Sequence, residues 1–194
     1  MNHKPHTTAL YGGTFNPIHL GHIRLGEALI KEGLADELWF LVSPQNPFKA
    51  NQELLADEER LRLARLAVEG RKGLYVSDAE FRLPRPSYMV HTLEALRQEH
   101  PDREFILVIG ADNWERFPQW YESDEIMRHH RLIILPRPGY ELAALPANVT
   151  VARTPLLNIS STDIRRQIAS GHYRGKGLPR PVWNEIRRKG LYQE

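Results

Sequence analysis

Short apolar runs alternate along the chain with longer stretches in which apolar residues recur every three or four positions. The short runs predict buried strands, and the longer stretches predict amphipathic helices. The run at residues 105–109 is apolar at every position, as in a central strand that is buried on both faces of a sheet. The expected strands are residues 7–11, 38–43, 74–76, 105–109, 132–135 and 149–151. The expected helices are residues 20–32, 54–68, 87–100, 123–129, 160–169 and 182–189.

The regular alternation of strands and helices is typical of βαβ units, which build a parallel sheet with helices on both faces. The expected fold class is therefore α/β, with an open, doubly wound sheet and one domain over residues 1–194. In such sheets, ligands bind beyond the carboxyl ends of the strands. A site is accordingly expected in the loops after the strands and in the turn before Ser160.

Composition excludes several classes of protein. Of the 194 residues, 41% are hydrophobic and 26% are charged, which is the usual balance of a globular protein. Cysteine is absent, which excludes disulfides, a cysteine nucleophile and cysteine-based metal sites. The longest apolar runs are far shorter than the roughly 20 residues that a membrane-spanning helix needs. Residues 1–8 are polar and do not resemble a signal peptide, so we expect a cytoplasmic protein with no membrane partner.

The distribution of charge is more informative than its total. The formal net charge of +2 gives no reason to expect a nucleic-acid partner. Residues 163–194, however, carry eight lysines and arginines and only three acidic residues. A basic segment of this kind is either a solvated surface or a binding site for an anion such as phosphate.

The loop after the first strand carries the clearest chemical signal. Gly12 and Gly13 follow the strand directly and let backbone N–H groups approach a ligand closely. His19 and His22 share one face at the start of the next helix, with Gly21 between them. Such histidines can cap the helix, and a zinc pair would need a third ligand that the sequence does not show. Two histidines after a double-glycine turn favour donation of N–H groups to phosphate oxygens.

A second signal is the segment Ile-Ser-Ser-Thr-Asp-Ile-Arg-Arg at residues 159–166. Ser160 and Asp163 resemble a capping box at the start of a helix. The hydroxyls of this segment can satisfy the free N–H groups of the helix, or they can join them in holding a triphosphate. Arg165 lies about one turn after Ser161, where its guanidinium can make forked hydrogen bonds to phosphate.

Three other residues are candidate nucleotide contacts. Asp112 follows the central strand and can either cap a helix or accept hydrogen bonds from a ribose. Trp120 is either a packed corner or a stacking surface for an aromatic base. Lys49 is the one lysine of a proline-containing loop after the second strand. The chain has no P-loop and no G-x-G-x-x-G, G-x-S-x-G or H-E-x-x-H motif, so a nucleotide site here does not cleave the γ-phosphate.

Together these motifs resemble a known family. H-x-G-H in the first loop, with Ile-Ser-Ser-Thr-x-x-Arg, is similar to the signature of the nucleotidyltransferase superfamily, which also includes class I aminoacyl-tRNA synthetases. The resemblance covers nearly the whole chain and implies a Rossmann-like, doubly wound sheet of the nucleotidyltransferase type with a small C-terminal helical part. Segments P-S-Y at 86–88, G-A-D at 110–112 and F-P-Q-W at 117–120 resemble the nicotinate mononucleotide adenylyltransferase branch.

The resemblance implies that AMP is transferred from ATP to nicotinate mononucleotide, giving nicotinate adenine dinucleotide and pyrophosphate in NAD biosynthesis. Mg²⁺ would be bound through the ATP phosphates, with no protein side chain as a metal ligand. The implied catalytic residues are His19, His22 and Arg165. The implied ATP-binding residues are Gly12, Gly13, Thr14, His19, His22, Lys49, Gly110, Asp112, Ser161, Thr162 and Arg165. The implied substrate-binding residues are Trp120, Ser87 and Tyr88, the first by stacking on the pyridine ring.

The chain departs from the family pattern at two positions. Met89 stands where relatives often have threonine, and His91 stands where they often have aspartate, so neither is assigned to the site. The alternatives are a nucleotidyltransferase with a phosphopantetheine or nicotinamide mononucleotide acceptor, and a non-catalytic nucleotide-binding relative. Intact His19, His22 and Arg165 argue against a non-catalytic relative. The sequence leaves a homo-oligomer open.

Overall fold

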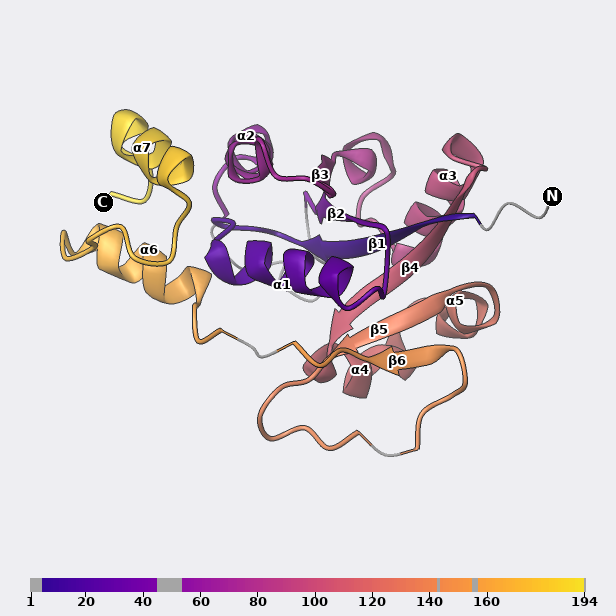
Figure 1. Cartoon of the computed structure of the whole chain (residues 1–194). Helices are drawn as coiled ribbons and strands as arrows, with labels where there is room; N and C mark the ends of the chain where they lie inside the picture. The colour runs from indigo at the N-terminus through magenta and orange to yellow at the C-terminus, as the bar shows by residue number, and fades with distance from the viewer. Residues whose placement is uncertain (1–4, 45–53, 143, 155–156, 194) are drawn as a thin grey trace.

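The centre of the fold is a parallel sheet. The computed structural model describes residues 5–44, 54–142, 144–154 and 157–193. Six strands lie in the order β3-β2-β1-β4-β5-β6, and each hydrogen-bonded pair is parallel (Figure 1). The strands are β1 (His6–Gly13), β2 (Glu37–Val42), β3 (Leu74–Ser77), β4 (Arg103–Gly110), β5 (Arg131–Leu135) and β6 (Val149–Val151). This order confirms the predicted α/β class with a doubly wound sheet.

Alternate residues of the four inner strands, β2, β1, β4 and β5, point into two separate hydrophobic clusters. In β1, Ala9 belongs to one cluster and Leu10 to the other. The first cluster packs against α1 (Leu20–Lys31), α2 (Asp57–Val68), α6 (Ser161–Ala169) and α7 (Arg180–Lys189). The second packs against α3 (Met89–Glu99), α4 (Ala111–Arg116) and α5 (Ser123–His129). Both faces of the sheet are therefore covered, which is why its central strands are apolar at successive positions.

The structure confirms the six predicted strands and the six predicted helices, with ends that differ by up to three residues. The sequence pattern does not predict the short helix α4 or the turns η2 (Ala79–Arg82) and η3 (Phe117–Gln119), because each is too short to show a period. The predicted helix 87–100 begins later, at Met89, because the N-cap residue Tyr88 has an extended backbone.

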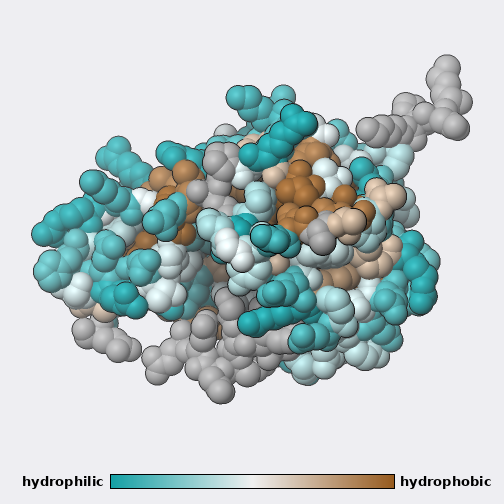
Figure 2. Space-filling view, turned by 90° about the horizontal axis from the view of Figure 1, so that it is seen from below, coloured by the Kyte–Doolittle hydropathy of each residue, from teal (hydrophilic) through white to brown (hydrophobic). Residues whose placement is uncertain are grey.

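The strand order reverses between β1 and β4, so the connections that follow these two strands cross opposite faces of the sheet. A crevice opens at such a point, at the carboxyl ends of the strands. Figure 2 shows that one face of the molecule is mostly hydrophilic, with smaller hydrophobic areas between polar side chains. In the described part of the chain, no helix is long and apolar enough to cross a membrane.

Candidate active site

The loop after β1 ends in a pair of stacked histidines. His19 is the N-cap residue of α1, and His22 is the third residue of that helix. The backbone N–H of His19 donates to Nδ1 of His22 at 3.1 Å. The two rings stack with 3.7 Å between their centroids. Both predicted histidines therefore lie together at the positive end of a helix, directly after the glycine turn.

Both histidines are neutral near pH 7. Burial lowers the pKa of His19 to about 4. Burial, His19 and Arg137 together lower the pKa of His22 well below its usual value. Because Nδ1 of His22 accepts a hydrogen bond, the single proton of its neutral ring lies on Nε2, which can donate to a ligand. In the described ranges, no group of three or more acidic or histidine side chains is placed to hold a metal ion.

The second motif lies against this loop. Ser160 caps α6 by accepting a hydrogen bond from the backbone of Asp163 at 3.3 Å. The hydroxyl of Ser161 donates to the carbonyl of Pro17 at 2.9 Å. Nη1 of Arg165 donates to the carbonyl of Asn16 at 2.7 Å. The structure thus brings the two sequence motifs together, and Thr162 lies exposed in the first turn of the same helix.

Arg60, which the sequence pattern does not indicate, supports the loop after β1 by hydrogen bonds. Its side chain is completely buried in α2. It donates to backbone carbonyls in the loop after β1, in the loop after β2 and before α2, and to one carboxylate: Thr14 (2.6 Å), Ser43 (2.8 Å), Pro44 (3.1 Å), Leu55 (2.9 Å) and Asp57 (2.5 Å). An arginine in an amphipathic helix gives no sequence signal of burial, because arginine is usually exposed. Lys49, predicted from the neighbouring loop, lies outside the described residues.

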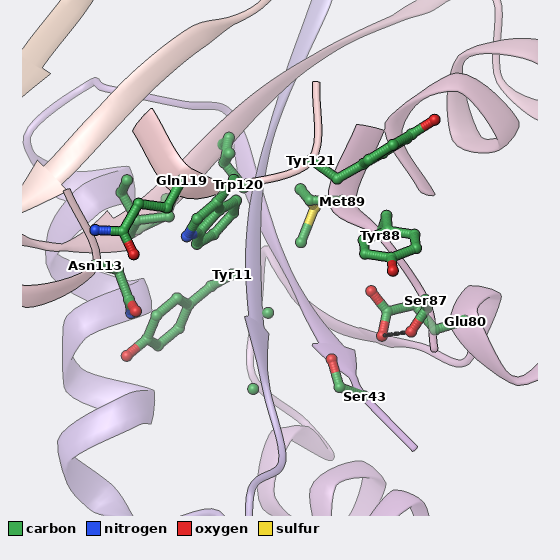
Figure 3. Close-up of a pocket in the computed structure, with 15 residues that line it drawn as sticks. Tyr11, Ser43, Glu80, Ser87, Tyr88, Met89, Asn113, Gln119, Trp120 and Tyr121 are labelled. Carbon is green, nitrogen blue, oxygen red and sulfur yellow. Dashed lines mark hydrogen bonds between the residues drawn. The ribbon is translucent and has the colours of Figure 1, made fainter. Parts of the chain in front are cut away.

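A pocket of about 410 Å³ lies beside the glycine turn (Figure 3). It extends from Tyr11 and the glycines at the end of β1 to Trp120, which follows η3. Aromatic side chains form much of its wall, and Nε1 of Trp120 is buried with no partner among the described residues. Other lining residues are Ser43, Glu80, Ser87, Tyr88, Met89, Leu107, Val108, Ile109, Asn113, Gln119 and Tyr121.

The N-terminus of α3 lies at the wall of this pocket. Tyr88 is its N-cap residue and Met89 its first helical residue, and both line the pocket. The first N–H groups of a helix have no partner within the helix and carry its positive end. The predicted residues Ser87, Tyr88 and Trp120 therefore line one cavity that offers both an aromatic surface and an anion-binding helix end.

Asp112 lies in the first turn of α4 and pairs with Arg137, at 2.7 Å between Oδ1 and Nε. The ion pair requires glycine at position 110, because a Cβ there would clash with Nε of Arg137 at 2.8 Å. Gly110 and Asp112 are candidates from the sequence pattern, whereas Arg137 is not. The position of Arg137, just beyond the carboxyl end of β5, was the signal that could have found it.

The comparisons with known proteins agree with this geometry. A family model described as cytidylyltransferase-like matches residues 10–167. A probable nicotinate-nucleotide adenylyltransferase of Bacteroides fragilis is 51% identical over 167 residues, covering 84% of this chain and 83% of that protein. A probable nicotinate-nucleotide adenylyltransferase of Christiangramia forsetii is 34% identical over the whole of both chains. A Plasmodium falciparum nicotinic acid mononucleotide adenylyltransferase complexed with NaAD has the same fold, with a TM-score of 0.75 at 16% identity over 96% of this chain and 97% of that one.

This protein is a nucleotidyltransferase by class. It combines a doubly wound sheet with the histidine-containing loop after β1, and the family model covers most of the chain. The relatives narrow the class further. The chain belongs to the nicotinate-nucleotide adenylyltransferases of the cytidylyltransferase-like family.

Proposed function

We propose that this protein transfers AMP from ATP to nicotinate mononucleotide, giving nicotinate adenine dinucleotide and pyrophosphate. One observation carries the proposal: the aromatic pocket with the N-terminus of α3 in its wall adjoins the glycine turn that leads to the histidine pair. A pyridine nucleotide fits the aromatic pocket, and a nucleoside triphosphate fits the glycine turn with its histidine pair. We assign the protein to the cytoplasm, where ATP is abundant.

The triphosphate would lie against the loop after β1. Backbone N–H groups of Gly12, Gly13 and Thr14 and the N-terminus of α1 supply donors there. Neutral His19 and His22 add donors that carry no charge to desolvate. Ser161, Thr162, Arg165 and Lys49 complete the proposed ATP contacts, and Gly110 and Asp112 are assigned to the nucleotide sugar. The substrate is written as MgATP, because Mg²⁺ held by phosphates and water needs no protein ligand.

Nicotinate mononucleotide would occupy the pocket. Its pyridine ring stacks on Trp120, and its carboxylate meets the free N–H groups at the start of α3, next to Ser87 and Tyr88. Its 5′-phosphate then points toward the glycine turn and the triphosphate. Met89 contributes a thioether to the wall instead of a hydroxyl, so the backbone has to supply the hydrogen bonds at that position.

The reaction needs positioning more than acid–base catalysis. An oxygen of the acceptor phosphate, already an anion at neutral pH, attacks the α-phosphorus of ATP. The bond from the α-phosphorus to the bridging oxygen breaks, and pyrophosphate leaves with those electrons. No protein nucleophile or general base is needed. The N–H donors of His19, His22 and Arg165 would stabilise the negative charge that develops on the phosphates.

The direct test measures pyrophosphate release from MgATP with different acceptors. We expect rapid release with nicotinate mononucleotide, slower release with nicotinamide mononucleotide and none with phosphopantetheine. Chromatography should identify nicotinate adenine dinucleotide as the product. Release with phosphopantetheine alone would assign the chain to another branch of the family, and nucleotide binding without any release would indicate a non-catalytic relative.

Trp120→Ala should weaken both pyridine mononucleotides by a similar factor. Stacking on the indole is available to either ring and contributes about 1–3 kcal/mol, by analogy with bases on aromatic side chains. Discrimination between carboxylate and carboxamide should come from N–H donors, which face the NH₂ of an amide unfavourably. The measurement is kcat/KM for both acceptors in both proteins. A ratio that collapses in the variant would mean that Trp120 itself determines selectivity.

Arg165→Lys should raise the KM for ATP by about tenfold, because an ammonium group cannot make the forked phosphate contact of a guanidinium. The arginine also reaches the carbonyl of Asn16, and a lysine cannot keep this contact and bind phosphate at the same time. The KM for nicotinate mononucleotide should change little. Steady-state kinetics with each substrate varied separately check this. An effect confined to the KM for nicotinate mononucleotide would show that Arg165 contacts the mononucleotide and not ATP.

A further inference from the structure

A buried carboxylate forms part of the pocket wall. Glu80 lies in η2, is only 3% exposed and lines the pocket. Its Oε2 accepts a hydrogen bond from the hydroxyl of Ser87 at 3.0 Å, drawn in Figure 3. Its Oε1 accepts from the hydroxyl of Thr92 at 3.2 Å. The hydroxyl of Ser43, just after β2, lines the same pocket and lowers the pKa of this carboxyl against the effect of burial.

No cation compensates this charge within the described part of the chain. The groups that stabilise the ionised form of Glu80 are hydroxyls, whereas burial raises the pKa of the carboxyl. A buried carboxylate with only neutral partners is costly for a protein. These hydroxyls come from two segments that meet at the pocket, the end of β2 and the start of α3, so the carboxylate lies between those segments.

Two of these hydroxyls bracket the start of α3. Ser87 lies two residues before Met89, and Thr92 lies in the first turn of the helix. Thr92 also approaches the carbonyl of Tyr88 at 3.3 Å. Glu80 therefore fixes both sides of the turn whose free N–H groups lie at the pocket wall, beside Tyr88 and Met89. A rotation of this turn would move those groups away from any ligand in the cavity.

From this geometry we infer that Glu80 is a positioning residue for the pyridine nucleotide: it holds the segment from Ser87 to the first turn of α3 in the orientation that binds the acceptor's carboxylate. The inference rests on the proposed function. Glu80 itself does not need to touch the substrate, since both of its oxygens are engaged by hydroxyls. Its effect should be confined to the acceptor, because its hydrogen bonds go to Ser87 and Thr92 at the start of α3 and not to the loop after β1.

Glu80→Gln is the direct test, because glutamine keeps the size of the side chain and removes the charge. We expect the KM for nicotinate mononucleotide to rise about tenfold, a typical loss for hydrogen bonds to a charged group. The KM for ATP should stay within about twofold and kcat should change little. Ser87→Ala, which removes one donor and leaves the carboxylate, should raise the same KM, and the two changes should be less than additive in the double variant.

Glu37→Gln is the matched control. Glu37 is also buried and accepts hydrogen bonds from Thr8, Trp39 and Arg103, but it begins β2 at the opposite end of the sheet. The substitution Glu37→Gln should lower the melting temperature and leave the KM values for ATP and for nicotinate mononucleotide unchanged.

Two outcomes would overturn the inference. If Glu80→Gln raised the two KM values equally, or affected only the melting temperature, Glu80 would be a structural residue. If it lowered the KM for nicotinate mononucleotide, its charge would be repelling the substrate. Should Glu80→Gln fail to fold, Thr92→Val decides the question by the same split between the two KM values, because Thr92 donates to Glu80 and is not assigned to the substrate. Failure of the proposed function is distinguishable, because the wild-type protein would then make no nicotinate adenine dinucleotide.

Discussion

His22→Ala should fold and yet lose about 100- to 1,000-fold in kcat. A single preorganised donor to charge that develops in a transition state contributes about 3–4 kcal/mol. His22 meets the requirements for such a donor, because its pKa is far below neutral and its Nδ1 is occupied by the N–H of His19. The proton available on Nε2 therefore does not depend on pH near neutrality. Steady-state turnover with saturating substrates, beside a thermal melt, is the measurement.

The control for His22 separates catalysis from helix capping. The N-cap hydrogen bond to Nδ1 is lost in the alanine variant, which should cost about 1 kcal/mol and a few degrees in melting temperature. In His22→Asn, the side-chain oxygen can still accept that hydrogen bond, but no group replaces Nε2. We expect His22→Asn to recover the melting temperature without recovering turnover. Recovery of both would show that His22 is a capping residue only.

Arg60→Met should be the most destabilising substitution in α2, lowering the free energy of unfolding by about 3–5 kcal/mol. The methionine fills similar space but leaves the carbonyls of Thr14, Ser43, Pro44 and Leu55 without their donor and Asp57 without its cation. In a protein of this size, the loss corresponds to about 6–20 °C in melting temperature. Calorimetry with and without MgATP measures it.

Arg65→Met is the matched control for Arg60, because it removes an arginine from the same helix. Arg65 is 58% exposed in its ion pair with Asp78, so its loss should cost less than about 1 kcal/mol. A similar small effect for Arg60→Met would mean that the carbonyls find other donors and that the buried guanidinium does not hold the two loops together.

The fold was predictable because its signals are local. An all-apolar run such as 105–109 reports burial on both faces of a sheet, and Gly33 or the Ser160 cap marks where a helix ends or begins. The histidine pair and the Arg165 motif were visible for the same reason, since each is a short pattern within one turn of a helix. Their mutual contact through Asn16 and Pro17 was not visible from spacing alone.

The remaining residues of the site depend on distant partners. Arg60, Glu80 and Arg137 each have ordinary sequence surroundings, and each acquires its role from a residue brought near by the fold. Burial of a charged group is a property of the tertiary structure, so no local pattern reports it. The late start of α3 likewise follows from an extended segment that propensity alone does not predict.

The contacts between the first loop and the last helices have a consequence for biosynthesis. Besides the contacts from Ser161 and Arg165, the hydroxyl of Tyr192 donates to Oδ1 of Asn16 at 2.8 Å, and the N–H of Leu20 donates to the carbonyl of Gly177. While only the first strands have emerged from the ribosome, the loop after β1 therefore lacks many of its hydrogen-bond partners. Such long sequence separations slow the closing steps of folding. The growing chain should acquire its nucleotide site only when residues 160–192 have emerged, so binding of ATP would report that this segment has left the ribosome.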